Sequence, residues 1–198
     1  MKKIIITLAL AAVAAFSANA QIGIGLGYAT KNFTNVFENE GGIFAGANYN
    51  IELSNGIAVA PGIEFAMLNY KKDDNNYQNE NYLAVPVMFN YSIEVADGFK
   101  LVPFLGPTVS FGLSSKVRSS VSTILGAIGG GSNEVDMYGD NSDYNRLDIL
   151  IGGGLALDVM DMIRVHVGYN QGLLNRNNDS DGSVIKTSGV NFGVAYLF

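Results

Sequence analysis

Large apolar residues recur at every second position along eight segments of this chain. The clearest is the C-terminal segment, where Val190, Phe192, Val194, Tyr196 and Phe198 alternate with residues that are mostly small or polar. Such alternation is the pattern of a β-strand that has one apolar face. The eight segments are 22–28, 43–53, 57–67, 83–93, 101–113, 147–157, 163–169 and 190–198. The pattern therefore predicts an all-β chain of eight strands.

The opposite face of these strands is built mainly from glycine and alanine. Charged residues make up only 15% of the chain, against roughly 25% in soluble domains. A sheet surface that faces water would carry more polar groups, whereas the inside of a narrow barrel has room only for small ones. The apolar face carries tyrosines such as Tyr28, Tyr49 and Tyr169, which suits a lipid-facing wall with aromatic girdles.

Strand and connection lengths indicate a membrane protein. Transmembrane strands need ~9–11 residues, whereas strands of soluble proteins usually have ~5–6. The connections alternate between long and short, as in bacterial barrels with long outer loops and short periplasmic turns. In chain order they are 31–42, 54–56, 71–78, 96–98, 114–145, 159–162 and 175–186. We therefore predict an eight-stranded antiparallel up-and-down transmembrane β-barrel over residues 21–198.

The first 20 residues are typical of a cleaved signal peptide. Lys2 and Lys3 precede an apolar run over residues 4–16, and Ala18-Asn19-Ala20 supplies the small-x-small cleavage pattern. The apolar run is shorter than the ~20 residues that a spanning helix needs. We expect cleavage before Gln21 and export to the outer membrane.

Several functional classes are disfavoured by what the sequence lacks. It has no cysteine, which excludes disulfides and thiol nucleophiles. Its net charge is -6 without basic clusters, so nucleic acid is not an expected partner. His166 is the only histidine and has no nucleophile motif or metal-ligand set to accompany it. We expect no enzymatic activity, no cofactor and no metal site.

One acidic loop resembles the start of a calcium-binding loop. Asn177, Asp179, Asp181 and Gly182 have its spacing. The position of the closing glutamate holds Ser188 instead. A solvated loop tip, rich in turn-forming residues, is the favoured interpretation.

Charged residues on the small-residue face are expected to point into the barrel. The interior of an eight-stranded barrel is just wide enough for side chains, and buried charges must be paired. We therefore expect ion pairs that fill the lumen, with Glu64 bound to Arg164 or Lys100. An ion path or proton relay is the alternative. The inward-facing set is Glu52, Glu64, Lys100, Asp148, Asp158, Arg164 and His166.

The fifth connection contains an apolar patch. Ile124, Leu125 and Ile128 precede a run of three glycines, and exposed apolar patches often mark contact sites. Residues 116–121 also continue a loose alternation, so the fifth strand is expected to protrude and to offer a sheet edge to another strand. We predict an interaction loop here.

Four motifs carry a resemblance to the porin-like outer-membrane β-barrel domain family, which is common in Bacteroidetes-type bacteria and similar in size to OmpX and the OmpA barrel. They are Tyr-Leu-Ala-Val-Pro-Val at 82–87, Pro-Phe-Leu-Gly-Pro at 103–107, Leu-Asp-Ile-Leu-Ile-Gly-Gly-Gly at 147–154 and Tyr-Asn-Gln-Gly-Leu at 169–173. The resemblance implies an outer-membrane location and insertion by the barrel-assembly machinery. That machinery recognises a terminal aromatic residue, here Phe198 with Tyr196 nearby. The resemblance implies no catalytic residues.

The expected function is a structural or cell-surface interaction role exerted through the long loops, with side chains filling the lumen. The expected partners are outer-membrane lipid, the assembly machinery and a surface ligand. A narrow passive pore or small-molecule carrier is the alternative, although open channels need ~16–18 strands.

Overall fold

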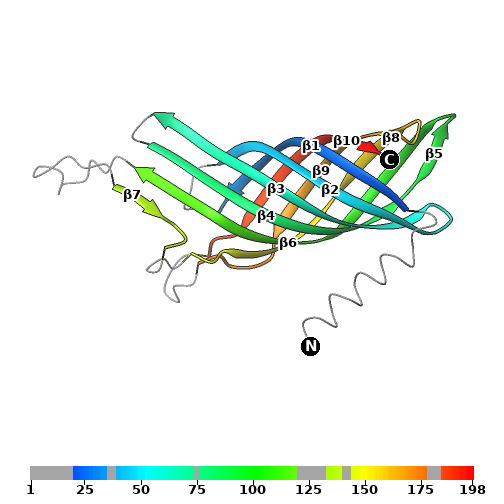
Figure 1. Cartoon of the computed structure of the whole chain (residues 1–198). Helices are drawn as coiled ribbons and strands as arrows, with labels where there is room; N and C mark the ends of the chain where they lie inside the picture. The colour runs from blue at the N-terminus through cyan, green and yellow to red at the C-terminus, as the bar shows by residue number, and fades with distance from the viewer. Residues whose placement is uncertain (1–19, 35–38, 74–75, 120–132, 140–143, 178–183) are drawn as a thin grey trace, which may run out of the picture.

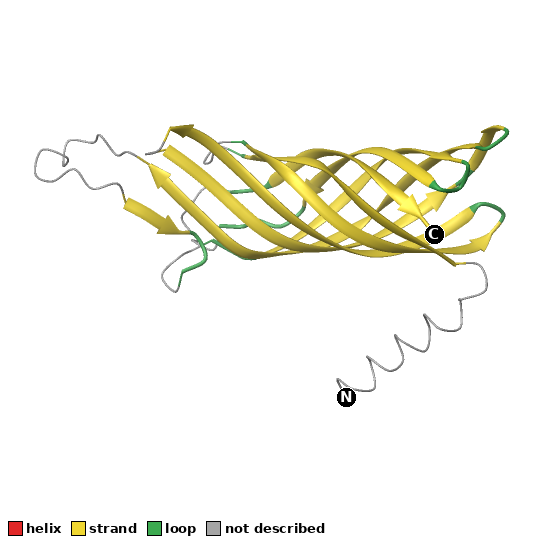
Figure 2. Ribbon diagram, turned by 45° about the horizontal axis from the view of Figure 1, so that its top comes forward, coloured by secondary structure: helices red, strands yellow, loops and turns green. Residues whose placement is uncertain are grey.

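The computed structural model describes residues 20–34, 39–73, 76–119, 133–139, 144–177 and 184–198. Within these ranges no helix is long and apolar enough to cross a membrane. Long tilted strands form one elongated wall (Figures 1 and 2). They are β1 (Ala20–Phe33), β2 (Glu40–Ser54), β3 (Ile57–Asp73), β4 (Asn76–Tyr91), β5 (Ile93–Ala96), β6 (Phe99–Ser119), β7 (Asn133–Asp136), β8 (Leu147–Val159), β9 (Ile163–Gly172) and β10 (Thr187–Leu197).

The wall is a closed antiparallel barrel of eight strands. The order is β4-β3-β2-β1-β10-β9-β8-β6, and β6 pairs with β4 to complete the ring. β5 continues the line of β4 after a break at Ser92, while β7 lies off the ring and pairs with β6. The two ends of the described chain meet in the pairing of β1 with β10, where Ile24 faces Tyr196. The predicted eight-stranded antiparallel β-barrel is confirmed.

The apolar face of the alternation points outward. Leu26 is 70% exposed, whereas Ala66 and Ala84 on the inner face are almost completely buried. This arrangement is the reverse of that in a soluble sheet protein, whose apolar face points to the core. Because the ring is closed, every spanning strand has its backbone hydrogen-bond partners, as hydrocarbon surroundings require.

Tight turns mark one end of the barrel, here called the turn end. Asn55 and Gly56 both have positive φ, at 45° and 81°, which is the geometry of the two-residue hairpin turns that Asn-Gly favours. Gly98 also has positive φ, and so do Met160 and Asp161 in the turn between β8 and β9. The three connections that were predicted to be short therefore lie at this end.

The opposite end, here called the loop end, differs from the prediction at two connections. The third connection is not a loop over 71–78, because β3 runs to Asp73 and β4 resumes at Asn76. The fifth strand, β6, does protrude, as expected, but its edges are covered. It pairs with β4 up to Arg118 on one side and with β7 on the other, so β6 itself offers no free edge over this stretch.

Candidate functional site

A buried ionic cluster lies at the loop end, with Glu80 of β4 at its centre. Lys31 of β1 places its Nζ 2.7 Å from Glu80 Oε2. Arg176, which follows β9, places Nη1 3.0 Å from Oε1, and the Tyr138 hydroxyl donates a hydrogen bond to the same oxygen. Glu80 and Arg176 are each only 1% exposed. Segments far apart in the chain thus converge on one carboxylate.

Aromatic rings surround these charges. The Tyr138 ring stacks on Tyr144 with 5.9 Å between centroids, and the Arg176 guanidinium lies 4.4 Å from the Tyr144 centroid. The Tyr138 hydroxyl accepts a hydrogen bond of 2.6 Å from Arg176 Nη2. Burial, together with the charge of Glu80, raises the pKa of Tyr138, so this hydroxyl stays protonated and can donate. We call Lys31, Glu80, Tyr138, Tyr144 and Arg176 the loop-end cluster.

The loop-end cluster holds the connecting segments in place. Arg176 Nε donates to the carbonyl of Asn145 at 3.0 Å, and Arg146 Nη2 donates to the carbonyl of Tyr138 at 2.6 Å. The backbone N–H of Asn145 in turn donates to the carbonyl of Arg176 at 2.7 Å. The segment that precedes β8 and the segment that follows β9 are therefore fixed to each other and to the barrel.

Gly112 of β6 makes room for this arrangement. A Cβ atom at Gly112 would collide with the Tyr138 hydroxyl and with its ring. The glycine thus lets Tyr138 fold inward over the barrel mouth and reach Glu80. A side chain at this position would push Tyr138 away from the carboxylate.

Two further acids lie near the same end. Thr187 Oγ1 donates to Asp148 Oδ2 at 2.6 Å, which connects β10 to β8. Glu40, the first residue of β2, is 2% exposed. The interior below the loop-end cluster is therefore rich in carboxylates.

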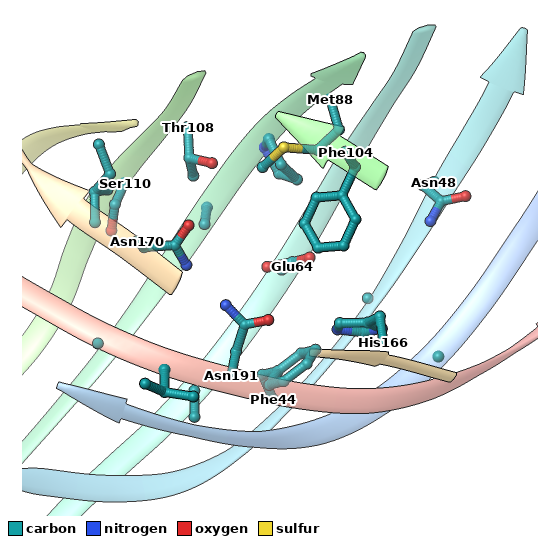
Figure 3. A pocket seen from close by; sticks show the side chains of 18 of the residues that line it. Phe44, Asn48, Glu64, Met88, Phe104, Thr108, Ser110, His166, Asn170 and Asn191 are labelled. Atoms are coloured by element: carbon teal, nitrogen blue, oxygen red, sulfur yellow. The ribbon is translucent and has the colours of Figure 1, made fainter. Parts of the chain in front are cut away.

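The middle of the barrel contains a cavity of about 170 Å³. Figure 3 shows Glu64 near its centre, with Phe44, Phe104, His166 and Asn191 around it. The His166 ring lies 6.1 Å from that of Phe44 and 6.3 Å from that of Phe104. In the described part of the chain, His166 has aromatic neighbours and no hydrogen-bonded nucleophile.

Ion pairs at the turn end are local. Arg164 binds Asp158 through two contacts, Nε to Oδ1 at 2.6 Å and Nη2 to Oδ2 at 2.7 Å. These residues face each other directly across β8 and β9. Lys100 Nζ lies 2.6 Å from Asp161 in the adjacent turn. The expected pairing of Glu64 with Arg164 or Lys100 is therefore wrong, and Glu52, expected inside, is exposed.

Other predicted positions fall into two groups. Tyr196 and Phe198 lie on the outer surface with 4.7 Å between their ring centroids. Ile124, Leu125 and Ile128 lie outside the described residues, as does most of the calcium-like loop. Among the residues that are described, no group of three or more histidines and acids is placed to hold a metal ion.

The sequence patterns did not predict the loop-end cluster, although they indicate that two of its side chains point into the barrel. Glu80 lies two and four residues before Tyr82 and Ala84, so the same alternation, continued toward the N-terminus, would have placed it inside. Lys31 likewise continues the inward series of Gly27 and Ala29 on β1. No periodicity leads to Arg176 or Tyr138, because both lie in irregular segments.

The comparisons with known proteins agree with this architecture. Residues 14–177 match the family described as outer membrane protein beta-barrel domain. Among solved structures, Ail, the attachment invasion locus protein of Yersinia pestis, superposes with a TM-score of 0.53 at 15% identity, covering 90% of this chain and 99% of Ail. Neisserial surface protein A superposes with a TM-score of 0.51 at 14% identity, covering 90% and 97%. No curated protein sequence matches significantly.

Likeness at these identities shows the fold, while the family match covers most of the sequence. Bacterial barrels of this construction place their long loops outside the cell and their short turns in the periplasm. The chain belongs to the outer membrane protein β-barrel domain family, and its place is the bacterial outer membrane.

Proposed function

We propose that this chain is a cell-surface interaction protein whose barrel anchors and orients its extracellular segments. The observation that carries the proposal is the loop-end cluster. Removing charges from water costs several kcal/mol per ion unless they are well paired, and a barrel that served only as an anchor would not need Glu80, Lys31 and Arg176 at its mouth. Their arrangement fixes the segments that leave β7 and β9.

The solved structures with this fold support a surface role. One structure holds Ail in complex with the heparin analogue sucrose octasulfate, and another is named a surface protein. This chain is suited to a different ligand, because it carries a net charge of -6 and its connection 114–145 has four acidic against two basic residues. A polyanion would be repelled. We propose a protein partner that contacts Ile124, Leu125 and Ile128.

The test is adhesion of a non-adherent Gram-negative strain that displays the full chain. Bacteria are counted on cultured epithelial monolayers and on heparin-coated wells. We expect binding to the monolayers above that of the empty strain and none to heparin. Replacing Ile124, Leu125 and Ile128 by serine should bring binding to background, while serine at Met160 and Met162 of the turn end should not. Undiminished binding by the loop variant would refute the proposal.

A narrow pore or small-molecule carrier is the second candidate, and the interior cavity is the observation that favours it. The cavity lies between two layers of ion pairs. Glu80 and Arg176 lie at the loop end, which we propose faces the exterior, and Asp158 and Arg164 lie at the turn end; all four are buried. We propose that these layers, together with inward side chains, prevent steady ion flow.

For assembly, we propose that residues 1–20 are removed on export and that Tyr196 and Phe198 are recognised by the barrel-assembly machinery. Both rings are accessible on the lipid side, 43% and 67% exposed. Phe198 also donates its backbone N–H to the carbonyl of Ile22 at 2.8 Å, where the first and last strands join. Deleting Phe198 should lower the heat-modifiable folded fraction in the outer membrane, and an unchanged fraction would contradict this role.

A further inference from the structure

Glu64 is an unpartnered acid in the barrel interior. It has no hydrogen bond or ion pair with any other residue that the structure describes, and it lines the central cavity. Figure 3 shows its carboxylate oxygens directed into the open space between Phe104, Asn191 and Phe44. A carboxylate in such a place carries a large desolvation cost unless a positive group or a proton accompanies it.

The charges around Glu64 do not supply that positive group. The cationic side chains that line the same cavity are already engaged, Arg164 with Asp158 and Lys31 with Glu80. Among the described interior residues, carboxylates outnumber cations by five to three. The carboxylates are Glu40, Glu64, Glu80, Asp148 and Asp158, and the cations are Lys31, Arg164 and Arg176. The interior therefore holds more carboxyl groups than cationic side chains, with space beside Glu64.

The lining of the cavity favours an organic cation over a metal ion. A metal ion such as Ca²⁺ takes six to eight oxygen ligands at ~2.3–2.6 Å, whereas no suitable set of acids and histidines gathers among the described residues. Phe44 and Phe104 instead present aromatic surface to the same space. Aromatic faces beside a carboxylate are suited to an ammonium group that carries carbon atoms.

The size of the cavity sets the size of the ligand. Its volume is about 170 Å³, close to the ~150 Å³ of an engineered protein cavity that accepts benzene. A ligand of about six heavy atoms is therefore the scale that fits. Asn48 and Asn191 add amide groups to the wall and can hydrogen-bond to polar atoms of such a ligand.

We propose that the barrel interior binds a small alkylammonium ion, with Glu64 as its counter-charge and the rings of Phe44 and Phe104 packed on its carbon atoms. This site is separate from the extracellular segments and gives the barrel a ligand of its own. The lining of the cavity reaches Ser188 and Gly189 of β10 near the loop end, which is the side closer to the cell exterior.

The experiment is a calorimetric titration of the refolded chain in detergent with n-butylammonium. A second sample is refolded in the presence of the probe and equilibrated by dialysis, so that probe bound inside is measured without entry through the ends of the barrel. Two compounds serve as controls. n-Butanol has the same chain length as n-butylammonium but no charge, and butyrate carries the opposite charge. We expect saturable binding of n-butylammonium alone.

Amino-acid substitutions test which side chains bind n-butylammonium. Glu64→Gln keeps the shape and removes the charge, and it should weaken n-butylammonium at least tenfold. Glu52→Gln removes an exposed carboxylate at the turn end and should leave the affinity unchanged. Phe104→Leu keeps Glu64 and should weaken binding about threefold, as loss of one cation–π contact predicts. Heat-dependent gel mobility verifies that each variant is folded.

Three results would overturn the proposal. They are the absence of saturable binding to the wild-type chain, equal binding of n-butanol, and an affinity in Glu64→Gln equal to that of the wild type. If Glu64→Gln fails to refold, the Phe104→Leu titration still tests the proposal. An unchanged affinity of Phe104→Leu for n-butylammonium would show that the aromatic ring does not contact the ion.

Discussion

The two ends of the barrel hold ion pairs of different kinds. At the turn end, Arg164 and Asp158 are six residues apart on adjacent strands and face each other in register. At the loop end, Glu80 is bound by Arg176 and Lys31, which are 96 and 49 residues away in the chain. The turn-end pair needs only the β8–β9 hairpin, whereas the loop-end pairs require the ring of strands to be closed.

This difference teaches which end depends on the complete fold. The turn-end pair can form once β8 and β9 have paired, and Lys100 lies next to Asp158 in the β6–β8 register as a further positive charge. The loop-end cluster forms only when β1, β4 and the segments around Tyr138 and Arg176 are all in place. We therefore expect the loop end to be the more sensitive to substitution.

The largest loss of stability is expected from Arg176→Met. It leaves Glu80 buried with one cationic partner fewer, and breaking a buried ion pair costs roughly 3–5 kcal/mol. The free energy of unfolding, measured by urea titration in detergent, should fall by about that amount. Lys186→Met, which removes an exposed lysine nearby, is the matched control, and a loss no greater than the control's would contradict the comparison.

A smaller loss is expected from Arg164→Met at the turn end. Hydrogen bonds to charged groups are each worth about 1.5–3 kcal/mol, and Lys100, which faces Asp158 across β6 and β8, can partly stabilise the remaining carboxylate. The same urea titration should show a loss of about 2 kcal/mol. The double variant with Asp158→Asn should recover part of it. A loss larger than that of Arg176→Met would reverse the ranking of the two ends.

Tyr138→Phe should cost about 1.5 kcal/mol, the lower end of the range for a hydrogen bond to a charged group. The ring and its stacking on Tyr144 remain, and Glu80 keeps both cations. Limited proteolysis of the loop end together with urea titration measures the effect. If this variant were as destabilised as Arg176→Met, the hydroxyl and not the ion pairs would hold the cluster together.

The smallest loss of stability is expected from Lys100→Met. Its ion pair with Asp161 is solvent-accessible, with side chains 36% and 61% exposed, and exposed pairs contribute about 0–1 kcal/mol. Unfolding at low and high salt should give nearly the same difference from the wild type. A salt-sensitive loss above that range would show that the turn end relies on this pair.

The sequence alone predicts the barrel wall because lipid on one side and a crowded interior on the other produce an alternation that can be read residue by residue. Val190 to Phe198 on β10 shows this most clearly. The extension of β3 to Asp73 and of β4 back to Asn76 was missed. In these extensions polar residues stand on both faces, so polarity no longer marks the period, although the inward Gln78 and Glu80 are buried.

The interior contacts were harder to predict than the wall. The alternation at every second residue predicts that Glu64 and Arg164 point inward. The tilt and stagger of the closed strands decide which inward residues contact each other. Arg164 therefore binds its neighbour Asp158, and Glu64 faces a cavity. Arg176 and Tyr138 come from irregular segments whose path follows from the closed ring.

Single-channel conductance in a planar bilayer tests the central claim most directly, since that claim is a surface anchor closed at both ends. The mature chain is refolded in detergent, its fold is verified by heat-dependent gel mobility, and it is then added to the bilayer. The account predicts a silent trace from the folded barrel. Steady, discrete openings of the verified wild-type barrel would contradict it and would favour the pore.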